Sequence, residues 1–397
     1  MAPYLDHAAT TPLRREARDA WLAAADSAGN ASSTHRAGQG ARRVLEDARE
    51  RLAAVLDCEP IEVVFTSGGT ESVNLALQGL WRARADGRDA VVLPDAEHHA
   101  TLDTVEALRS AGARVSAVAV DGLGRISAEA FAEAVAAPAV ALATALIANN
   151  EVGTINDAPA LSAAAAASGV PLHLDAVAAL GHVPVSFRAL RADAPAGAGL
   201  VALSIAGHKI GAPVGTGALL VARTARLSAL LHGGGQQRGL RAGTQDVAGA
   251  VALAVAAELA ESEREGERER LRGMRDALID GIRARVPEAV LLGDPGADEP
   301  GRLPGNVHLL FPGAPSESML FLLDQADISA SAGSACQAGV SEPSHVVQAM
   351  GFSEGEARSV LRLTLGRTST RDDVDAVLAV ITQAYARASG TASGKRS

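Results

Sequence analysis

A histidine and a lysine stand side by side directly after a short apolar run. Residues 200–205 predict a buried strand, which Ala206 and Gly207 end. His208 and Lys209 follow at its carboxyl end. Ligands bind at that end of the strands in open α/β sheets, and a desolvated lysine there can form a Schiff base with a carbonyl compound. An isolated His-Lys pair is ordinarily a surface feature, so the choice depends on the rest of the chain.

A second stretch has the features of an anion site. Residues 61–65 predict a strand, the sequence SGGT follows at 67–70, and a helix is expected to begin near Glu71. This arrangement aims backbone N–H groups and a hydroxyl at an anion such as phosphate. The spacing is neither that of a P-loop nor that of a dinucleotide fingerprint, so it does not indicate a nucleotide. A capped helix after a strand explains the stretch equally well.

Polar side chains also follow three further predicted strands. They are His98 and His99, then Asn149, Asn150 and Glu151, and finally Asp175. Each group has an ordinary explanation as an interior imidazole, turn asparagines or a helix-capping aspartate. Together with residues 67–70 and Lys209, however, they are all predicted on one rim of one sheet. We therefore interpret them as parts of a single site.

The elements around these residues alternate between strands and helices, which predicts an α/β protein with a mostly parallel sheet wrapped by helices. A long helix at 246–285 has an almost entirely charged middle, ESEREGERERLR, typical of a solvated face and of a hinge to a second unit. The remainder predicts a smaller α/β unit. Its strands are expected at 306–311, 328–331 and 360–365, and its helices at 316–325, 344–350 and 371–387.

The composition excludes several classes of function. The 397 residues carry 36 lysines and arginines against 46 acidic residues, a net charge of -10, so we expect no direct nucleic-acid partner. No apolar stretch is long enough to span a membrane, and the N-terminus has neither the basic nor the apolar region of a signal peptide. We therefore expect a cytoplasmic protein with no membrane partner.

The two cysteines, Cys58 and Cys336, are far apart, and in a reducing compartment no structural disulfide is expected. Cys58 follows a helical stretch and is interpreted as a small buried hydrophobic residue. Cys336 lies in a loop rich in Gly, Ser and Ala, predicted at 332–343.

Ten motifs, in this order, resemble the cysteine desulfurases of the NifS/IscS type, within the class V aminotransferase family of fold-type I enzymes. They are DHAATTP, GNASSTH, FTSGGTES, EHHATLD, NNEVGT, AGHKIGAP, HGGGQQRGLRAGT, SAGSACQAG, EPSHV and LRLTLGRTST. The resemblance implies a large domain at 14–255 with a mostly parallel seven-stranded sheet. Residues 1–13 and 256–387 would form the small domain that carries the Cys336 loop, and the tail at 388–397 is expected to be disordered.

The resemblance implies pyridoxal 5'-phosphate (PLP) as cofactor and no metal. Lys209 would hold it covalently, and Asp175 would pair with its pyridinium nitrogen, which lets the ring accept electrons. His98 would stack on the ring and take part in catalysis. The phosphate would be bound by Gly69, Thr70 and His208, and by Thr244 from the other subunit of a homodimer.

The resemblance also implies a substrate site and a sulfur carrier. Asn150 and Arg362 would bind near the carboxylate of L-cysteine, a planar anion suited to a bidentate arginine, and Asn30 would also contact the substrate. Cys336 would take the sulfur as a persulfide, leaving L-alanine. The sulfur would pass to an acceptor protein, an iron–sulfur scaffold or a tRNA thiolase.

Three departures from the family leave alternatives open. Ala178 stands where a glutamine usually contacts the cofactor, and Ala206 where a serine usually contacts the phosphate. Losing both hydrogen bonds would weaken cofactor binding by roughly 1 to 3 kcal/mol. The third departure is a C-terminus without the extension used near the iron–sulfur scaffold. The alternatives are a weakly binding paralogue that serves as a scaffold, and another PLP reaction such as that of a selenocysteine lyase.

Overall fold

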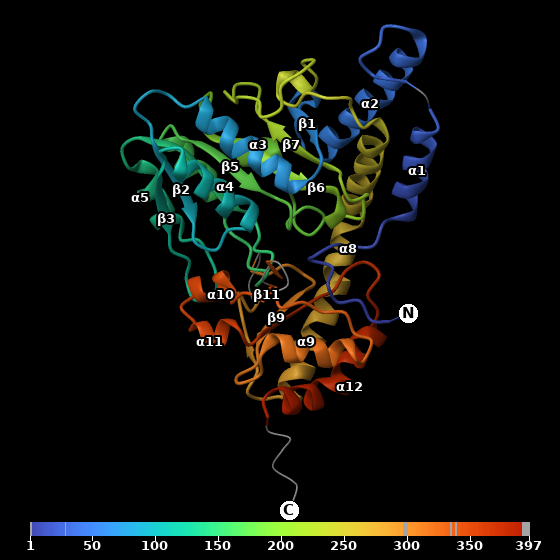
Figure 1. Cartoon of the computed structure of the whole chain (residues 1–397), viewed down its shortest axis with the longest axis vertical. Coiled ribbons are helices and arrows are strands. Elements are labelled where there is room, and N and C mark those ends of the chain that lie inside the picture. The colour runs from blue at the N-terminus through green and yellow to red at the C-terminus, as the bar shows by residue number, and fades with distance from the viewer. Residues whose placement is uncertain (1, 28, 297–300, 334–335, 338–339, 391–397) are drawn as a thin grey trace, which may run out of the picture.

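The computed structural model describes residues 2–27, 29–296, 301–333, 336–337 and 340–390, with the backbone alone for 336, 337, 340 and 341. These residues form two units, one above the other in Figure 1. The larger unit contains the main sheet, and the smaller one contains the C-terminal strands and helices. The N-terminal residues before the first helix contact both units, because Leu5 N–H donates to Ser329 O (2.9 Å) in the smaller unit and Thr11 N–H donates to His208 O (3.0 Å) in the larger one.

The larger unit is built on one seven-stranded sheet in the order β1-β7-β6-β5-β4-β2-β3. β7 alone runs in the direction opposite to the other strands of this sheet, because both of its pairings, with β1 and with β6, are antiparallel. Every residue of β2, β4, β6 and β7 is buried, as expected for a sheet covered on both faces. The predicted fold class is therefore confirmed. The strands are β1 Val63–Thr66, β2 Ala90–Pro94, β3 Arg114–Val118, β4 Val140–Leu146, β5 Pro171–Asp175, β6 Gly199–Ala206 and β7 Gly217–Val221.

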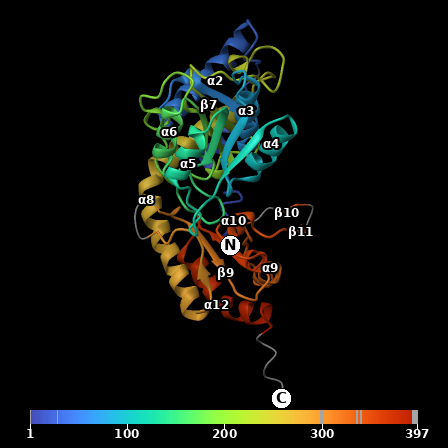
Figure 2. The same cartoon turned by 90° about the vertical axis from the view of Figure 1, so that its left-hand side faces the viewer.

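Helices cover both faces of this sheet. Figure 2 shows α3 Gly69–Arg82 and α4 His99–Ser110 on one face, and α5 Ala128–Ala136 and α6 Ala158–Ala167 on the other. The starts of α4, α5 and α6 are defined by side chains that accept a backbone N–H, those of His98, Ser127 and Asp157. The remaining elements of the unit are α1 Arg15–Ala25, α2 Arg36–Val55, α7 Phe187–Arg191, η1 Pro60–Glu62, η2 Gly207–Lys209 and η3 Gln237–Gly239.

The smaller unit is a three-stranded antiparallel sheet in the order β12-β9-β8, packed against helices. Its strands are β8 Val290–Leu291, β9 Asn306–Leu310 and β12 Val360–Thr364, and its helices are α9 Ser316–Asp324, α10 His345–Ala349, α11 Glu354–Ala357 and α12 Arg371–Ala388. Of the helices in the described part of the chain, none has the length and apolar character needed to cross a bilayer.

Helix α8, Val247–Arg285, joins the two units (Figure 1). Its buried residues up to Ala260 belong to the core of the larger unit, and those from Leu271 onward belong to a separate core in the smaller one. Ion pairs three residues apart, such as Arg264 with Glu261 (3.1 Å), lie between these cores and match the predicted solvated face. We propose that the domain boundary falls in this charged segment, at 261–270, a few residues after the expected 255.

Two local predictions were wrong. Residues 328–331 are not a strand, because only Ser329 and Ser331 form isolated bridges, to Tyr4 and Arg362. Their partners lie on different segments, so no continuous ladder forms. The backbone at 332–343 is also not entirely irregular, because it contains the hairpin β10 Cys336–Gln337 and β11 Val340–Ser341. Residues 391–397 of the predicted disordered tail lie outside the described part of the chain.

Candidate active site

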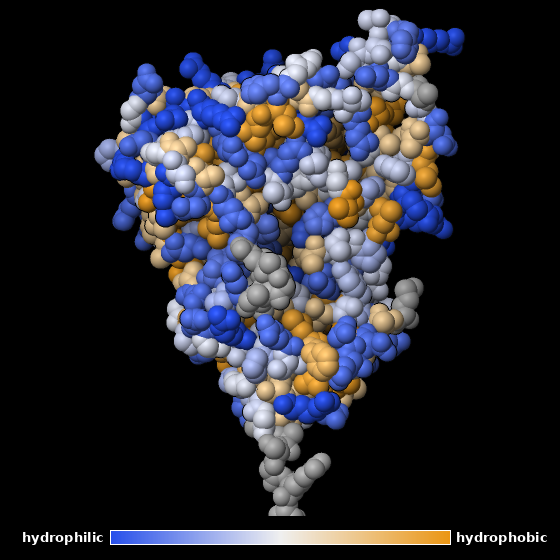
Figure 3. Space-filling view, in the orientation of Figure 1, coloured by the Kyte–Doolittle hydropathy of each residue, from blue (hydrophilic) through white to orange (hydrophobic). Residues whose placement is uncertain are grey.

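A cavity of about 400 Å³ opens at the carboxyl ends of β4, β5 and β6, between the two units. Figure 3 shows the surface hollowed between these units. The cavity brings together eight of the eleven residues to which the resemblance assigns a role. They are Gly69, Thr70, His98, Asn150, Asp175, His208, Lys209 and Arg362.

Lys209 ends the short turn η2 that follows β6. The turn needs Gly207, because a Cβ there would lie 2.2 Å from Thr216 Oγ1. The Nζ of Lys209 donates to the carbonyl oxygens of Ala8 and Ala9 in the N-terminal turn, the latter at 3.0 Å. Burial, with the charge of Arg362, lowers the pKa of Lys209 to about 8. A useful fraction of the amine is therefore neutral and nucleophilic near neutral pH.

Two buried carboxyl groups influence each other's charge, and one of them, that of Asp175, also interacts with the lysine. Asp175 ends β5, and its Oδ1 accepts the N–H of Val177 (2.8 Å). Burial raises the pKa of Asp175 to about 6. Glu97 follows β2 and accepts the N–H of Leu146 (2.8 Å), and burial together with the charge of Asp175 raises its pKa to about 8. At neutral pH Asp175 is therefore mainly ionised and Glu97 mainly protonated. The sequence analysis missed Glu97, although it directly precedes His98.

His98 caps α4, and this contact determines its protonation. Its Nδ1 accepts the N–H of Ala100 (3.0 Å), so in the neutral ring the proton is on Nε2. Burial, with the charge of Lys209, lowers the pKa of His98 to about 4. His98 is thus an uncharged ring in the cavity wall that presents a donor at Nε2.

The start of α3 has the strand–turn–helix geometry expected of an anion site. Gly68 has a φ of 148°, a conformation that L-residues with side chains rarely adopt, and the helix begins at Gly69. Glu71 accepts the N–H of Ser67 (2.7 Å) and pairs with Arg241 (2.9 Å). This ion pair connects the turn to the glycine-rich loop at 232–244. The N-terminus of this 14-residue helix faces the same cavity as Lys209.

Arg362 enters the cavity from β12 of the smaller unit. Its guanidinium is held by Asp6 Oδ1 (3.0 Å) and by Asn150 O (2.9 Å), and the residue is only 4% exposed. These contacts hold the planar donor group in one orientation, as recognition of a carboxylate requires.

Both ends of the segment that carries Cys336 are anchored at the cavity. At one end Ser331 bridges to Arg362, and at the other Ser344 Oγ donates to Glu151 Oε2 (2.5 Å). The Nε2 of His345 donates to Glu97 O (2.8 Å), and this ring also lines the cavity. The sequence analysis missed His345, although the motif EPSHV contains it. The side chain of Cys336 lies outside the described part of the chain.

Two predicted residues do not line the cavity of their own chain. Asn30 is exposed in the turn before α2, where its Oδ1 accepts the N–H of Ser32 (2.9 Å). Thr244 is exposed in the loop before α8. Their roles stay predictions.

The geometry agrees with comparisons to known proteins. A family model described as aminotransferase class V matches residues 3–377. The chain belongs to the class V aminotransferase family. The chain is 47% identical to a Mycobacterium tuberculosis protein named IscS-like cysteine desulfurase, over 97% of the chain and 96% of the relative. It is 38% identical to the cysteine desulfurase IscS of Methanosarcina thermophila, over 96% and 91% of the two chains.

Solved structures lead to the same family. A NifS-like protein superimposes with a TM-score of 0.87 at 29% identity, covering 96% of this chain and 99% of that one. DndA from Streptomyces lividans superimposes with a TM-score of 0.74 at 34% identity, covering 91% and 99%. The predicted resemblance is confirmed over nearly the whole chain.

The family implies PLP as cofactor, and the residues of this chain fit it. One cavity holds a buried amine with a lowered pKa, a buried carboxylate and a helix N-terminus. These groups are suited to an aldehyde, a protonated ring nitrogen and a phosphate, respectively. The volume of about 400 Å³ is in the range of small-molecule pockets.

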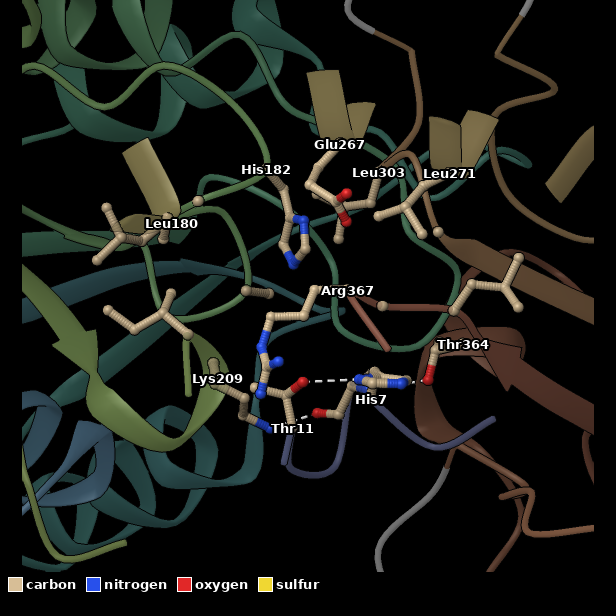
Figure 4. A pocket seen from close by; sticks show the side chains of 18 of the residues that line it. His7, Thr11, Leu180, His182, Lys209, Glu267, Leu271, Leu303, Thr364 and Arg367 are labelled. Carbon is tan, nitrogen blue, oxygen red and sulfur yellow. Dashed lines mark hydrogen bonds between the residues drawn. The ribbon is translucent and has the colours of Figure 1, made fainter. Parts of the chain in front are cut away.

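A second cavity, of about 90 Å³, is also lined by Lys209 (Figure 4). His7, hydrogen-bonded to Thr11 (2.7 Å), forms one side of it, and His182 and Glu267 lie on the opposite side. Ala178 lines both this cavity and the larger one. There is therefore open volume around position 178 that a longer side chain could enter.

Proposed function

We propose that this protein is a PLP-dependent cysteine desulfurase that converts L-cysteine to L-alanine and carries the sulfur as a persulfide on Cys336. The observation that carries the proposal is the convergence of Lys209, Asp175 and the start of α3 on one cavity that Arg362 enters from the other unit. Relatives named cysteine desulfurase, up to 47% identical over nearly the whole chain, support this activity.

In this proposal the residues of the chain divide the work of binding and proton transfer. Bound PLP supplies the electron sink that allows the Cα–H bond of an amino acid to break. Asp175 holds the charged ring nitrogen, and Arg362 binds the substrate carboxylate and so orients the Cα–H bond. The Nζ of Lys209, once neutral, takes the proton from Cα.

The sulfur-transfer step is assigned to Cys336. Its thiolate forms an S–S bond with the substrate sulfur while the substrate C–S bond breaks, and the bonding electrons remain on the carbon, which takes up a proton to give alanine. The persulfide then passes to an acceptor protein of iron–sulfur assembly or tRNA thiolation, in the cytoplasm. Thr244, exposed and outside the cavity of its own chain, fits a homodimer in which it reaches the partner's phosphate site.

The test is alanine release from L-cysteine by the PLP-loaded protein, with dithiothreitol as sulfur acceptor. The proposal expects alanine and sulfide in equal amounts, and no alanine without PLP. A protein that binds PLP and releases no alanine would exclude this function.

A second candidate is a paralogue that binds PLP weakly, and Ala178 and Ala206 in the cavity wall favour it. If these alanines have removed cofactor contacts, Ala178→Gln with Ala206→Ser should tighten PLP binding by about 1 to 3 kcal/mol, a factor of about 5 to 150. The dissociation constant is measured by titrating the cofactor-free protein with PLP. Ala136→Gln, at an exposed position of α5, is the matched control. Unchanged or weaker binding in the double variant would show that the two positions are not cofactor contacts.

PLP capture should depend on pH through Lys209. Because only the neutral amine attacks the aldehyde, and burial lowers the pKa of Lys209 to about 8, the capture rate should rise with pH up to about 8 and then level off. The rate is followed by absorbance from pH 6 to 10, with a free lysine derivative as control. A capture rate that keeps rising to pH 10, as for the free amine, contradicts the low pKa.

A further inference from the structure

The second cavity, of about 90 Å³, lies where the two units meet, and most of its residues have no role in the proposed function. Arg367 reaches it from the segment between β12 and α12 of the smaller unit, and His182 from the segment after β5 of the larger one. In Figure 4 the His182 ring points toward Arg367. Burial, with the charges of Arg367 and His182, lowers the pKa of His7 to about 4, so the three groups are close enough to interact.

The carboxylates in the wall of this cavity are already paired with arginines. Glu263 pairs with Arg14 (2.8 Å), and both oxygens of Glu267 accept from Arg270 (2.8 and 2.7 Å). Arg367 differs, because no carboxylate of the described residues forms an ion pair with it. Its Nη2 donates to a backbone carbonyl of the N-terminal segment (2.6 Å), and its Nε is buried without a partner. The cavity wall therefore carries an uncompensated positive charge with an unused donor.

His182 supplies a second unused donor. No described residue hydrogen-bonds its ring, and its nitrogens are not among the buried atoms that lack a partner, so they face open space. Burial lowers the pKa of His182, so the ring is neutral and carries one N–H. Much of the remaining wall is apolar and includes Leu271 and Leu303. Such surroundings strengthen the attraction between the guanidinium and an anion.

We propose that the second cavity binds a small oxyanion whose oxygens accept hydrogen bonds from Arg367 and His182. Carboxylates, phosphate and sulfate share this chemistry, and a guanidinium is the side chain best suited to bind them. A metal ion is not supported, because the described residues contain no cluster of three or more His, Cys, Asp or Glu that could hold one. The bound ion would contact both units beside Lys209 and Ala178, which line both cavities. It would therefore link the two units next to the main cavity.

The test is thermal unfolding of the PLP-loaded protein, with phosphate, sulfate or acetate replacing chloride at constant ionic strength. Because the ion binds only the folded chain, the midpoint should rise with the concentration of at least one of these anions and give its dissociation constant. Arg367→Gln should weaken that binding by about tenfold or more, because it removes a charged donor. Arg362→Gln, which removes the arginine of the main cavity, should keep the effect.

Three outcomes overturn the proposal. They are no anion effect, the same affinity in wild type and Arg367→Gln, and an effect that is lost in Arg362→Gln but kept in Arg367→Gln. The last would place the anion in the main cavity.

A second variant tests the location without changing a charge. Ala260 lies in α8, is only 6% exposed and lines the second cavity, so Ala260→Leu should fill the space and abolish the anion effect while both donors remain. Arg43→Gln, at an exposed position of α2, is the control and should keep the effect. The midpoint of each variant in chloride alone shows whether it is folded. An anion effect that persists in Ala260→Leu would show that the ion binds elsewhere.

Discussion

Alanine in place of Lys209 should reduce alanine formation from cysteine by at least about 1000-fold, because the variant loses both the nucleophile that holds the cofactor and the base that moves the Cα proton. The measurement is alanine released per subunit at saturating PLP. Lys209→Arg is the matched control, because it keeps a positive charge but has no amine that adds to an aldehyde. It should be as inactive as Lys209→Ala, which separates the chemistry from the charge.

The covalent attachment of the cofactor to Lys209 can also be tested directly by chemical labelling. The chain contains two lysines, Lys209 and Lys395, so borohydride treatment of the loaded protein can attach the cofactor to only these two side chains. Mass spectrometry of the digested protein should find the label on the peptide of Lys209, which is buried, and not on that of Lys395. A label on Lys395, or turnover in Lys209→Ala, would show that the cavity is not the cofactor site.

Alanine in place of Cys336 should also reduce turnover by about 1000-fold or more, because the covalent sulfur acceptor is lost. Cofactor binding and the spectral change on adding cysteine should persist, because these steps involve Lys209 and Arg362 instead. The measurements are alanine release with dithiothreitol and, in wild type, a mass increase of one sulfur on the Cys336 peptide after a single turnover.

Cys58 provides the control for that experiment. Burial, with the charge of Glu62, raises the pKa of the Cys58 thiol to about 12, so this thiol stays protonated and unreactive. Cys58→Ala should therefore keep full activity and form the persulfide normally. If Cys336→Ala keeps its turnover of cysteine or selenocysteine, the chemistry is that of a lyase acting without a persulfide, the alternative raised by the sequence.

Most of the strands and helices, and the residues at the strand ends, could be predicted because they depend on local sequence patterns. Apolar runs such as residues 200–205 predict strands, and the turn residues after them place Lys209 and Asp175 at strand ends. Because carboxyl ends of parallel strands share one edge of a sheet, the rim was predicted before any contact was known. The strand predicted at 328–331 was wrong because a local pattern does not show which distant segments pair with it.

The sequence by itself determined the α/β alternation, the family and the identities of the residues at the rim. Only the tertiary structure decided their chemical states. The contact of Arg362 with Asp6 joins residues 356 positions apart, and the Glu97 carbonyl that orients His345 is 248 positions away. The protonation of Glu97, the low pKa of Lys209 and the tautomer of His345 arise from desolvation and from such distant partners. No pattern of neighbouring residues encodes these effects, because burial exists only once the chain has folded.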